Sequence, residues 1–500
     1  MSTEREVKLS APPTFRMPWL DGIADGVSAL PRETERLKTT YVDTDDYRLA
    51  RWGVSLRHRA GQGWTTKLPA ETSGPLLVRG EYTVPGDEGV PPLESVDLVR
   101  AYVRTAELRP VARLRTVRRH VELRDFQDRL FADVVDDEVS VLSGRRIAAR
   151  FRELEVEIPD EIAQEVPDGL LEGLIARLRA AGAGEPDTTS KYVRAVGALA
   201  TRSPEVVAPS LPSGSSAGVV VRRAIGASVI HVLRHDVVVR LDSNPEGVHQ
   251  ARVATRRLRS DLRTFSSLLE AEWTRSLREE LRWLGVVLGD ARDADVMLER
   301  VRSRAASIPV TEAPGAARVL DALDRRRKEA HAVVIETLRG DRYVELLDRL
   351  VAAANEPDLL LGADLPAVQV LPGLVRGPWR ALRRYVRTAG SSPTDEQLHM
   401  IRIRTKRVRY AADAVAPLMG RPARRFADEA AALQTVLGEH NDAVVAEAWL
   451  RTWAASERSG DASFAAGMLA GIERAGAQTA RERWRRRWKR LAARDLRGWM

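Results

Sequence analysis

Hydrophobic and polar residues alternate along a series of short segments in residues 1 to about 200. Such alternation is typical of β-strands, because successive side chains of a strand point to opposite faces. The segments are 39–43, 54–59, 64–68, 78–84, 111–123, 129–135 and 151–158. Gly61-Gln62-Gly63 and Asp125-Phe126-Gln127-Asp128 lie between consecutive segments and predict hairpin turns. Many short antiparallel strands predict a β-barrel or a sandwich, with helices expected only at 93–108 and 169–181.

Charged residues occupy one face of strand after strand in this region, and apolar residues occupy the other. The charged residues are Glu4, Glu6, Lys8, Arg57, Arg59, Lys67, Arg79, Glu81, Arg113, Arg115, Glu153, Glu155 and Glu157. A sheet with its charged face in water explains the pattern, and so does a closed barrel with a charged interior. Acidic residues cluster on the first and last strands, with basic residues between them. This placement favours the barrel, because a charged interior needs charges of both signs and a ligand to neutralise them.

Helical spacing rich in Ala, Leu, Arg and Glu replaces the alternation after about residue 217. Residues 201–217 contain three prolines and a Ser/Gly cluster, which predicts a flexible linker. The predicted fold is therefore α+β in two domains. An antiparallel β-barrel is expected in residues 1–200, and an all-α helical bundle in residues 218–500.

The helical region contains an internal repeat. The sequence HQARVATRRLR at 249–259 matches HMIRIRTKRVR at 399–409, with an offset of 150 residues. Downstream, 284–294 matches 433–443 with an offset of 149 residues. A repeat of this length predicts two half-domains of similar plan.

Both copies of the repeat carry a basic stripe on one helical face, because their residues are spaced by three and four positions. The first stripe contains His249, Arg252, Arg256, Arg259 and Arg263, and the second contains His399, Arg402, Lys406 and Arg409. A stripe of this kind is ordinarily the solvated side of a helix. Here almost no acidic residue lies within it to form i,i+4 pairs, and like charges at that spacing repel each other. The repetition of this repulsion favours a bound anion over a solvated face.

The composition agrees with a polyanionic ligand without identifying it. Lys and Arg number 79 against 70 Asp and Glu, which gives a net charge of +9 and a pI near 10.0. The chain has no cysteine, which excludes disulfides and thiolate metal sites, and a cytoplasmic protein is expected. The absence of a run of about 18 apolar residues argues against a membrane span. Aromatic residues make up only 5% and do not interleave with the basic stripe, which argues against specific nucleic-acid binding.

Several motifs, taken in order, resemble the CYTH domain of the triphosphate tunnel metalloenzymes. They are Glu4-x-Glu6-x-Lys8, Tyr41-Val42-Asp43-Thr44 followed by Leu49, Leu56-Arg57-x-Arg59-x-Gly61, Lys67, Glu153-Leu154-Glu155-Val156-Glu157 and Ser190-Lys191-Tyr192. The resemblance spans about residues 4–200. It implies an antiparallel β-barrel tunnel that binds a linear triphosphate with Mg²⁺ or Mn²⁺.

The resemblance also implies roles for individual residues. The metal ligands would be Glu4, Glu6, Glu155 and Glu157, with a further acidic ligand from Asp133, Asp136 or Asp137, of which we expect Asp136. Phosphate oxygens would contact Arg57, Arg59, Lys67, Arg79, Arg113, Arg115 and Lys191. Lys8 would position phosphate beside the catalytic glutamates Glu4 and Glu6.

One strand departs from the family pattern. The family often continues the strand of Arg113 and Arg115 with a further basic residue, whereas alternation here leads to Val117. A bulge could bring Arg118 or Arg119 to the tunnel, and the sequence leaves open which of the two faces it.

The two copies of the helical motif resemble the CHAD domain, the conserved histidine α-helical domain, over about residues 220–490. The family implies a pseudo-twofold bundle whose basic surface binds inorganic polyphosphate. The residues that match by motif are His249, Arg252, Arg256, Arg259, His399, Arg402, Lys406 and Arg409. Either histidine could instead cap or pack a helix. We expect Asp293 and Asp442, in the second motif, to cap or to pair with arginines.

Together these features predict a metal-dependent hydrolase of inorganic triphosphate or short polyphosphate, joined to a polyphosphate-binding module. A cytoplasmic location, with association to polyphosphate granules as an option, follows from that ligand. One alternative is a non-catalytic polyphosphate receptor. Another is a tunnel enzyme that acts on thiamine triphosphate or ATP. The preferred metal and the oligomeric state are not determined by the sequence.

Overall fold

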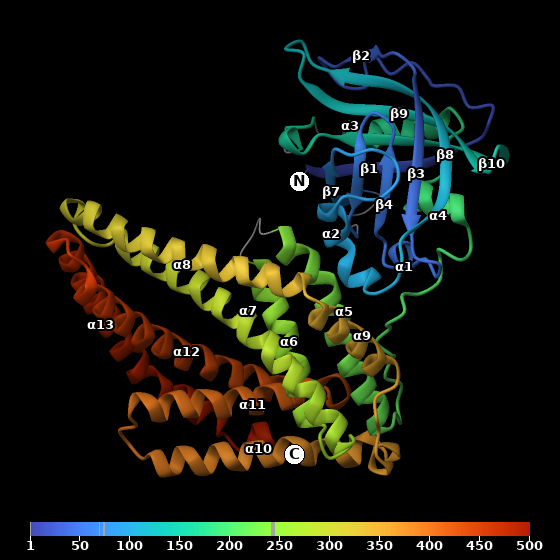
Figure 1. Ribbon diagram of the computed structural model, residues 1–500. Coiled ribbons are helices and arrows are strands. Elements are labelled where there is room, and N and C mark those ends of the chain that lie inside the picture. The colour runs from blue at the N-terminus through green and yellow to red at the C-terminus, as the bar shows by residue number, and fades with distance from the viewer. Residues whose placement is uncertain (1, 70, 74–75, 164, 168, 242–245) are drawn as a thin grey trace. The chain divides into compact units, whose positions relative to one another are not determined.

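The computed structural model describes residues 2–69, 71–73, 76–163, 165–167, 169–241 and 246–500 (Figure 1). The side chains of residues 2, 4 and 71–73 lie outside this description. The chain forms two compact units, Met1–Glu205 and Val206–Met500, which divide inside the predicted linker. The end of the first unit is held in place, because Arg104 Nη1 donates to Glu205 Oε1 at 2.7 Å. No described helix is both long and apolar enough to cross a bilayer.

The first unit is a closed antiparallel β-barrel, which confirms the prediction. Around the ring the strands follow the order β1-β10-β9-β8-β3-β4-β5-β7, and β7 pairs again with β1. Their bounds are β1 (Ser2–Ala11), β3 (Glu35–Asp43), β4 (Ser55–Arg59), β5 (Gly63–Lys67), β7 (Leu76–Val84), β8 (Arg109–Arg124), β9 (Leu130–Ser143) and β10 (Arg146–Ile158). Two short strands pair outside the ring, β2 (Ser28–Pro31) with β8 and β6 (Glu71–Ser73) with β7.

Both predicted hairpin turns join neighbouring strands of the barrel. Gly61 and Gly63 have φ values of 83° and 86°, a left-handed conformation that glycine adopts without strain, between β4 and β5. Between β8 and β9, Asp125 Oδ1 accepts hydrogen bonds from the backbone N–H groups of Gln127 and Arg129 at 2.8 and 2.9 Å. These local contacts fix the register of each pair.

Alternation along β1 and β10 separates an apolar outer face from a charged inner face. On the outer face Val7, Leu9, Leu154 and Val156 are fully buried against helix α3 (Leu170–Ala180). Lys8 lies opposite Glu155, and Glu6 opposite Glu157, in the antiparallel register. Because α3 covers the apolar side, these charged residues are directed into the barrel.

Three further helices accompany the barrel. They are α1 (Arg48–Arg51), α2 (Leu93–Val103) and α4 (Lys191–Val196). Ser190 caps α4 by accepting a hydrogen bond from the Val193 N–H at 3.2 Å. This cap fixes the start of the helix, so that Lys191 and Tyr192 are both buried.

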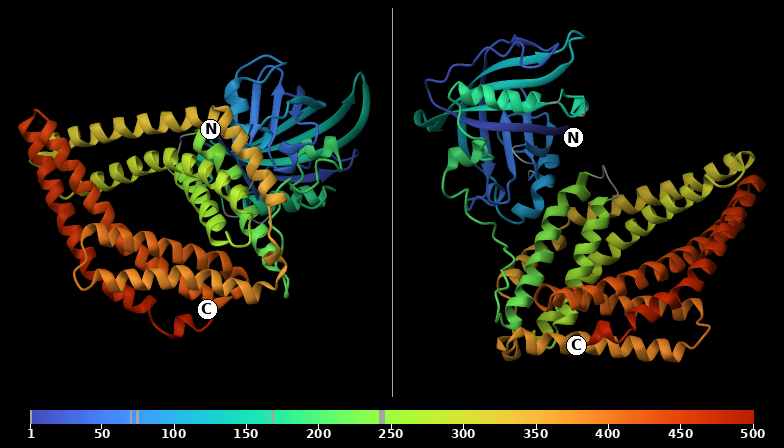
Figure 2. Two further views of the ribbon diagram at one scale, coloured as in Figure 1. Left: turned by 60° about the horizontal axis from the view of Figure 1, so that its bottom comes forward. Right: turned by 180° about the vertical axis from the view of Figure 1, so that it is seen from behind.

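In the second unit, the described residues form helices and no strand. Its helices are α5 (Ala217–Leu241), α6 (Glu246–Thr264), α7 (Ala271–Ala305), α8 (Ala313–Arg339), α9 (Asp341–Asn355), α10 (Ala367–Ala389), α11 (Asp395–Met419), α12 (Arg421–Ser456) and α13 (Gly460–Leu491). Figure 2 shows the α7–α8 and α12–α13 hairpins converging at their tips. An apolar cluster joins them there, with Val301, Val319, Leu450 and Leu469 all fully buried.

The internal repeat is visible in backbone hydrogen bonds between the halves. The Ala217 N–H donates to Leu365 O at 2.9 Å, and the Ala367 N–H donates to Ser215 O at 3.0 Å. The donors are 150 residues apart in the sequence, and so are the acceptors. The repeat therefore relates each of these hydrogen bonds to the other, as expected for two halves related by a pseudo-twofold axis.

Candidate functional site

The barrel encloses a cavity of about 150 Å³ whose wall is dominated by cations. Its basic residues are Lys8, Arg57, Arg59, Lys67, Arg79, Arg118 and Lys191, and its acidic residues are Glu81, Glu155 and Glu157. Burial and the neighbouring Arg57 and Arg118 lower the pKa of Arg59 to about 10. Clustered buried cations of this kind are stabilised by an anion.

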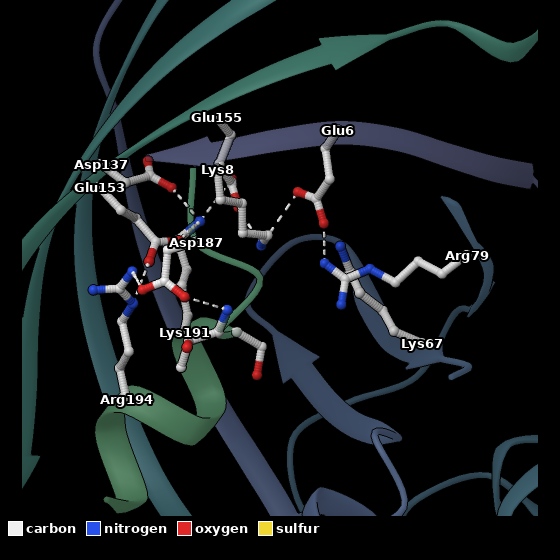
Figure 3. Close-up of polar contacts among 12 residues, drawn as sticks. Glu6, Lys8, Lys67, Arg79, Asp137, Glu153, Glu155, Asp187, Lys191 and Arg194 are labelled. Carbon is white, nitrogen blue, oxygen red and sulfur yellow. Dashed lines mark hydrogen bonds and ion pairs between the residues drawn. The ribbon is translucent and has the colours of Figure 1, made fainter. Parts of the chain in front are cut away.

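Three carboxylates at one side of the cavity form a candidate metal site. Glu6, Glu155 and Glu157 each offer an oxygen, and these oxygens lie within 4.8 Å of one another. Glu6 is fully buried and pairs with Arg79 and with Lys8, whose Nζ lies 3.2 Å from Glu6 Oε2 (Figure 3). Glu6 Oε2 accepts no hydrogen bond from the described residues. A buried carboxylate oxygen without a hydrogen bond, beside two further carboxylates, fits a hard divalent cation.

Lys8 lies between the acids of this group. Its Nζ donates to Glu155 Oε1 at 2.6 Å. Burial lowers the pKa of Lys8, but the charges of Glu155 and Glu6 outweigh burial and raise it above its ordinary value. Lys8 is therefore a fixed cation, suited to hold phosphate and unsuited to act as a base at neutral pH.

Lys191 is held by a second carboxylate group. Its Nζ lies 2.6 Å from Glu155 Oε2, 2.7 Å from Asp137 Oδ2 and 3.0 Å from Glu153 Oε1 (Figure 3). Burial alone would lower the pKa of Lys191, but Glu155, Glu153 and Asp137 hold it well above its ordinary value. In turn, Lys191, Lys8 and Arg118 overcome burial and hold the pKa of Glu155 well below its ordinary value.

Arg118 is the β8 arginine that faces the cavity. Its Nε and Nη2 contact both oxygens of Asp137 at 2.9 and 2.6 Å, and Nη2 also reaches Glu155 at 3.0 Å. Arg119 is 44% exposed and pairs with Glu138 at 2.9 Å on the outer face. The structure therefore resolves which of the two adjacent arginines points inward.

The prediction that Arg113 and Arg115 line the tunnel is wrong. Both side chains are exposed, whereas Leu114 and Thr116 between and after them are buried. Leu114 belongs to an apolar cluster with Tyr41 and Tyr192. Because this cluster takes the even-numbered side chains of β8 inside, Arg113 and Arg115 point outward, and the register is regular from Arg113 to Arg118.

The prediction for Asp136 is corrected in the same way. Asp136 lies on the outer face, where Arg152 contacts its two oxygens at 2.8 and 2.7 Å. Asp137, one residue later, is fully buried and pairs with Arg118 and Lys191, which line the cavity. Asp133 pairs with His120 at 2.7 Å. The Glu4 side chain lies outside the described residues, although its backbone pairs with that of Arg79.

Glu81 is a cavity residue that the sequence reasoning did not select. Its oxygens lie 3.5 Å from Arg57 Nη2 and 3.3 Å from Lys67 Nζ. Its alternation with Arg79 along β7 was the signal that could have identified it. Glu81 orients two of the cations that were predicted to contact phosphate.

An aromatic pair closes part of the cavity wall. The rings of Tyr41 and Tyr192 stack with centroids 4.8 Å apart and planes 8° apart. The Tyr192 hydroxyl donates to Asp43 Oδ2 at 2.7 Å, and Asp43 also accepts the N–H groups of Leu49 and Ala50. Because Asp43 is itself fully buried, its hydrogen bond with Tyr192 holds the stacked rings in place.

The helical unit contains a larger basic cavity of about 1050 Å³ between α6, α7, α10 and α11. We call it the basic cavity. Its cations are Arg256, Arg259, Arg263, Arg275, Arg278, Arg282, Arg404, Lys406 and Arg407, and its acidic lining residue is Glu279. The stripe residues Arg256, Arg259, Arg263 and Lys406 are brought together here. The arginines of α7 were missed, since nothing in the sequence placed α7 beside the stripe.

Four stripe residues meet where α6 and α11 approach each other. Burial, followed by the charges of Arg402, Arg256 and Arg252, lowers the pKa of Lys406 to about 7. The repeat relates Arg252 to Arg402 and Arg256 to Lys406. The buried Nε atoms of Arg256 and Arg402 have no hydrogen-bond partner among the described residues. Cations in this state are poised for an anionic ligand.

The remaining stripe residues lie outside the lining of the basic cavity. His399 Nδ1 contacts Asn441 Oδ1 at 2.5 Å, and Arg409 pairs with Asp413 at 3.4 Å. Arg252 pairs with Asp293 at 3.0 Å, as expected for that aspartate. Burial, followed by the charge of Arg292, lowers the pKa of His249, which makes it a weaker cation than its arginine neighbours.

Comparison with known proteins agrees with this architecture. The CYTH domain model matches residues 2–192, and the CHAD domain model matches residues 223–451. Two proteins of Mycobacterium tuberculosis, MT2285 of strain CDC 1551 and Rv2226 of strain H37Rv, are each 32% identical over 504 residues. The alignment covers 95% of this chain and 93% of theirs.

Two solved structures are similar to part of the chain. PptA from Streptomyces chartreusis is 24% identical with a TM-score of 0.46, covering 55% of this chain and 100% of that one. The CHAD domain from the plant Ricinus communis is 25% identical with a TM-score of 0.48, covering 58% of this chain and 96% of that one.

Proposed function

Because the chain belongs to the family of proteins that join a CYTH domain to a CHAD domain, we propose that it hydrolyses inorganic triphosphate or short polyphosphate in its barrel and binds polyphosphate with its helical unit. The observation that carries this proposal is the combination of charges at the barrel cavity. Three carboxylates gather within 4.8 Å of one another, and seven arginines and lysines line the cavity beside two of them, Glu155 and Glu157. A metal complex of a linear phosphate anion has the matching distribution of charge.

The metal would be Mg²⁺ or Mn²⁺, which prefer oxygen ligands. Glu6, Glu155 and Glu157 would hold it, and we include Glu4 from its place on β1. When bound, such an ion polarises phosphoryl oxygens and lowers the pKa of a coordinated water.

The residues of the chain would bind and orient the substrate. Arg57, Arg59 and Arg118 present guanidinium groups suited to bidentate phosphate contacts. Lys8 and Lys191 add fixed ammonium charges beside the glutamates. The acidic and basic residues of the cavity already pair with each other. A bound metal ion would form stronger ion pairs with the carboxylates, and a bound phosphate would form stronger ion pairs with the arginines and lysines. Stabilising the charge on a transferred phosphoryl group is the main task in this chemistry.

The size of the cavity supports an inorganic substrate. Sites for larger organic ligands typically measure about 300–1000 Å³, whereas this cavity measures about 150 Å³. Its aromatic side chains, Tyr41 and Tyr192, are stacked on each other, and neither leaves both faces open to a base or thiazole ring. Thiamine triphosphate and ATP are therefore the less favoured substrates.

Polyphosphate binding by the helical unit rests on the basic cavity and on two further cations beside it. Arg256, Arg259 and Lys406 would contact phosphate directly, with Arg252 and Arg402 adjacent. A cytoplasmic location at polyphosphate granules would follow from this binding. A non-catalytic receptor that uses both units is the second candidate, supported by the same cations.

Phosphate release distinguishes the enzyme from the receptor. Purified protein is assayed with tripolyphosphate, long-chain polyphosphate, ATP and thiamine triphosphate, with Mg²⁺ or Mn²⁺ and with chelator. The enzyme hypothesis requires metal-dependent release from tripolyphosphate that Glu6→Ala abolishes while polyphosphate binding is retained. No release by the wild-type protein with either metal would favour the receptor.

A further inference from the structure

The repeat gives every residue of the basic cavity an equivalent position in the other half of the helical unit. An offset of 150 residues relates α6 to α11 and α5 to α10, and an offset of 149 relates α7 to α12. Burial follows the same equivalence: Leu258 and Val408 are both fully buried, as are Leu284 and Leu433. The charges on the two sides can therefore be compared position by position.

Four of the nine cations of the basic cavity have no basic equivalent in the other half. The equivalents of Arg278, Arg282 and Arg404 are Ala427, Ala431 and Ala254. The equivalent of Arg263 is Asp413, which reverses the charge. Arg256 and Lys406 are equivalents of each other. The side of the bundle equivalent to the basic cavity thus combines fewer cations with a new acidic residue.

Several cations that remain on the equivalent side are paired. Asp413 Oδ2 lies 3.4 Å from Arg409 Nε, and Asp413 Oδ1 lies 3.3 Å from Arg424 Nη1. These arginines are the equivalents of Arg259 and Arg275. Arg257, the equivalent of Arg407, lies 4.0 Å from Asp261. Asp413 and Asp261 therefore already pair with cations that would otherwise bind phosphate.

A larger side chain also occupies the equivalent side. Gln434 replaces Gly285 and accepts a hydrogen bond from Arg409 at 3.4 Å. This contact uses a donor of Arg409 that an anion would otherwise engage. Tyr410, which replaces Ser260, does not separate the two sides, because it lines the basic cavity and its ring lies near both Arg256 and Arg409, with guanidinium-to-centroid distances of 5.5 and 5.6 Å.

Among the cations of the basic cavity, Arg275 pairs with Glu272 at 2.8 Å, whereas Arg259, Arg263, Arg278 and Arg404 lie among other cations. Burial and the neighbouring Arg282 and Arg256 lower the pKa of Arg259, and burial with Arg278 and Arg259 lowers that of Arg263. The buried Nε atoms of Arg278 and Arg404 have no hydrogen-bond partner within the described part of the chain. A bound anion would relieve the repulsion among these cations and would accept hydrogen bonds from the N–H groups that have no partner.

We propose that the helical unit binds polyphosphate on one side only, with a single polymer segment in the basic cavity, and that its pseudo-symmetric counterpart does not bind. This inference rests on the proposed polyphosphate binding and adds its location and stoichiometry. The sequence motif alone treats both stripes as equal. In the structure the two sides differ, because Asp413 replaces Arg263, and Ala427 and Ala431 of α12 replace Arg278 and Arg282 of α7.

The test uses equivalent residues as matched controls. Arg259 and Arg409 are both half-buried arginines at equivalent positions. Each is replaced by Ala in full-length protein that also carries Arg57→Ala and Arg59→Ala, which weaken binding in the barrel. Isothermal titration with linear polyphosphate of one defined short length, in the presence of chelator, gives affinity and stoichiometry. Circular dichroism melts check that both variants are folded.

Arg259→Ala is expected to weaken binding about tenfold or more, since it removes a charge-assisted hydrogen-bond donor, whereas Arg409→Ala changes it less than about twofold. One polymer segment per protein is expected. Equal weakening by the two variants, or two equivalent binding sites, would overturn the one-sided model. No binding by either the wild-type or the background protein would instead overturn the proposed polyphosphate function of the helical unit.

Discussion

Arg118 Nη2 lies 2.6 Å from Asp137 Oδ2 inside the barrel, on the strand pair β8–β9 where the two residues are directly opposite each other. The next residue, Arg119, contacts Glu138 on the outer face. Two adjacent arginines are thus separated by the wall of the barrel. Only Arg118 is placed to contact a ligand in the cavity.

Arg118→Ala is expected to reduce kcat/KM for tripolyphosphate by about 10- to 100-fold, since it removes a charged donor worth about 1.5–3 kcal/mol. Steady-state phosphate release measures the effect. Arg119→Ala is the matched control and should stay within about twofold of wild type. A larger loss from Arg119→Ala than from Arg118→Ala would contradict the assigned register.

The acidic side of the site could be predicted from the sequence, and the β8 side could not. Glu6, Lys8 and Glu155 alternate with residues whose apolar character fixes which face is outside. On β8 both faces carry arginines, so alternation alone leaves the choice open. The packing of Leu114 against Tyr41 and Tyr192 decides it, and those residues are distant in sequence. The α7 arginines of the basic cavity were missed for the same reason: their neighbours are set by helix packing.

Lys406 should couple polyphosphate binding to proton uptake. Burial and three arginines lower its pKa to about 7, so at pH 8 to 9 most of the free protein carries a neutral amine at this position. A bound anion favours the charged form and raises the pKa, so binding should take up as much as one proton and weaken as pH rises above 7. Titration calorimetry in buffers of different ionisation enthalpy measures this uptake. Lys406→Arg, which stays charged, should bind without it; equal uptake by the variant would rule out Lys406 as the source.

Lys191→Ala should strongly destabilise the barrel. The substitution leaves Asp137, Glu153 and Glu155 buried without their shared ammonium, and removing one partner of a buried ion pair costs about 3–5 kcal/mol. Urea unfolding measures the loss. Arg150→Ala, an exposed position on β10, should change stability by less than about 0.5 kcal/mol.

The pH dependence separates this charge effect from lost packing. Without Lys191 the pKa values of the buried carboxylates rise, so the folded variant binds more protons than its unfolded chain near neutral pH. Its stability deficit relative to wild type should therefore shrink as pH falls from 7 to 5. A deficit that is constant over this range would indicate that packing, rather than charge, is responsible.

Divalent metal should stabilise the folded protein through the group of Glu6, Glu155 and Glu157. A ligand that binds only the folded state adds about 2.7 kcal/mol at 100 times its dissociation constant, so Mg²⁺ or Mn²⁺ should raise the Tm in the absence of substrate. Glu157→Gln keeps the shape of the side chain but removes one charge, and should weaken the Tm response and the Mn²⁺ affinity measured by electron paramagnetic resonance. Glu161→Gln is the control, because Glu161 is exposed and lies outside this group. A Tm response equal in both variants would mean that the metal binds elsewhere. A weakened response in Glu157→Gln alone would assign the metal to the same carboxylates that face the cations of the cavity.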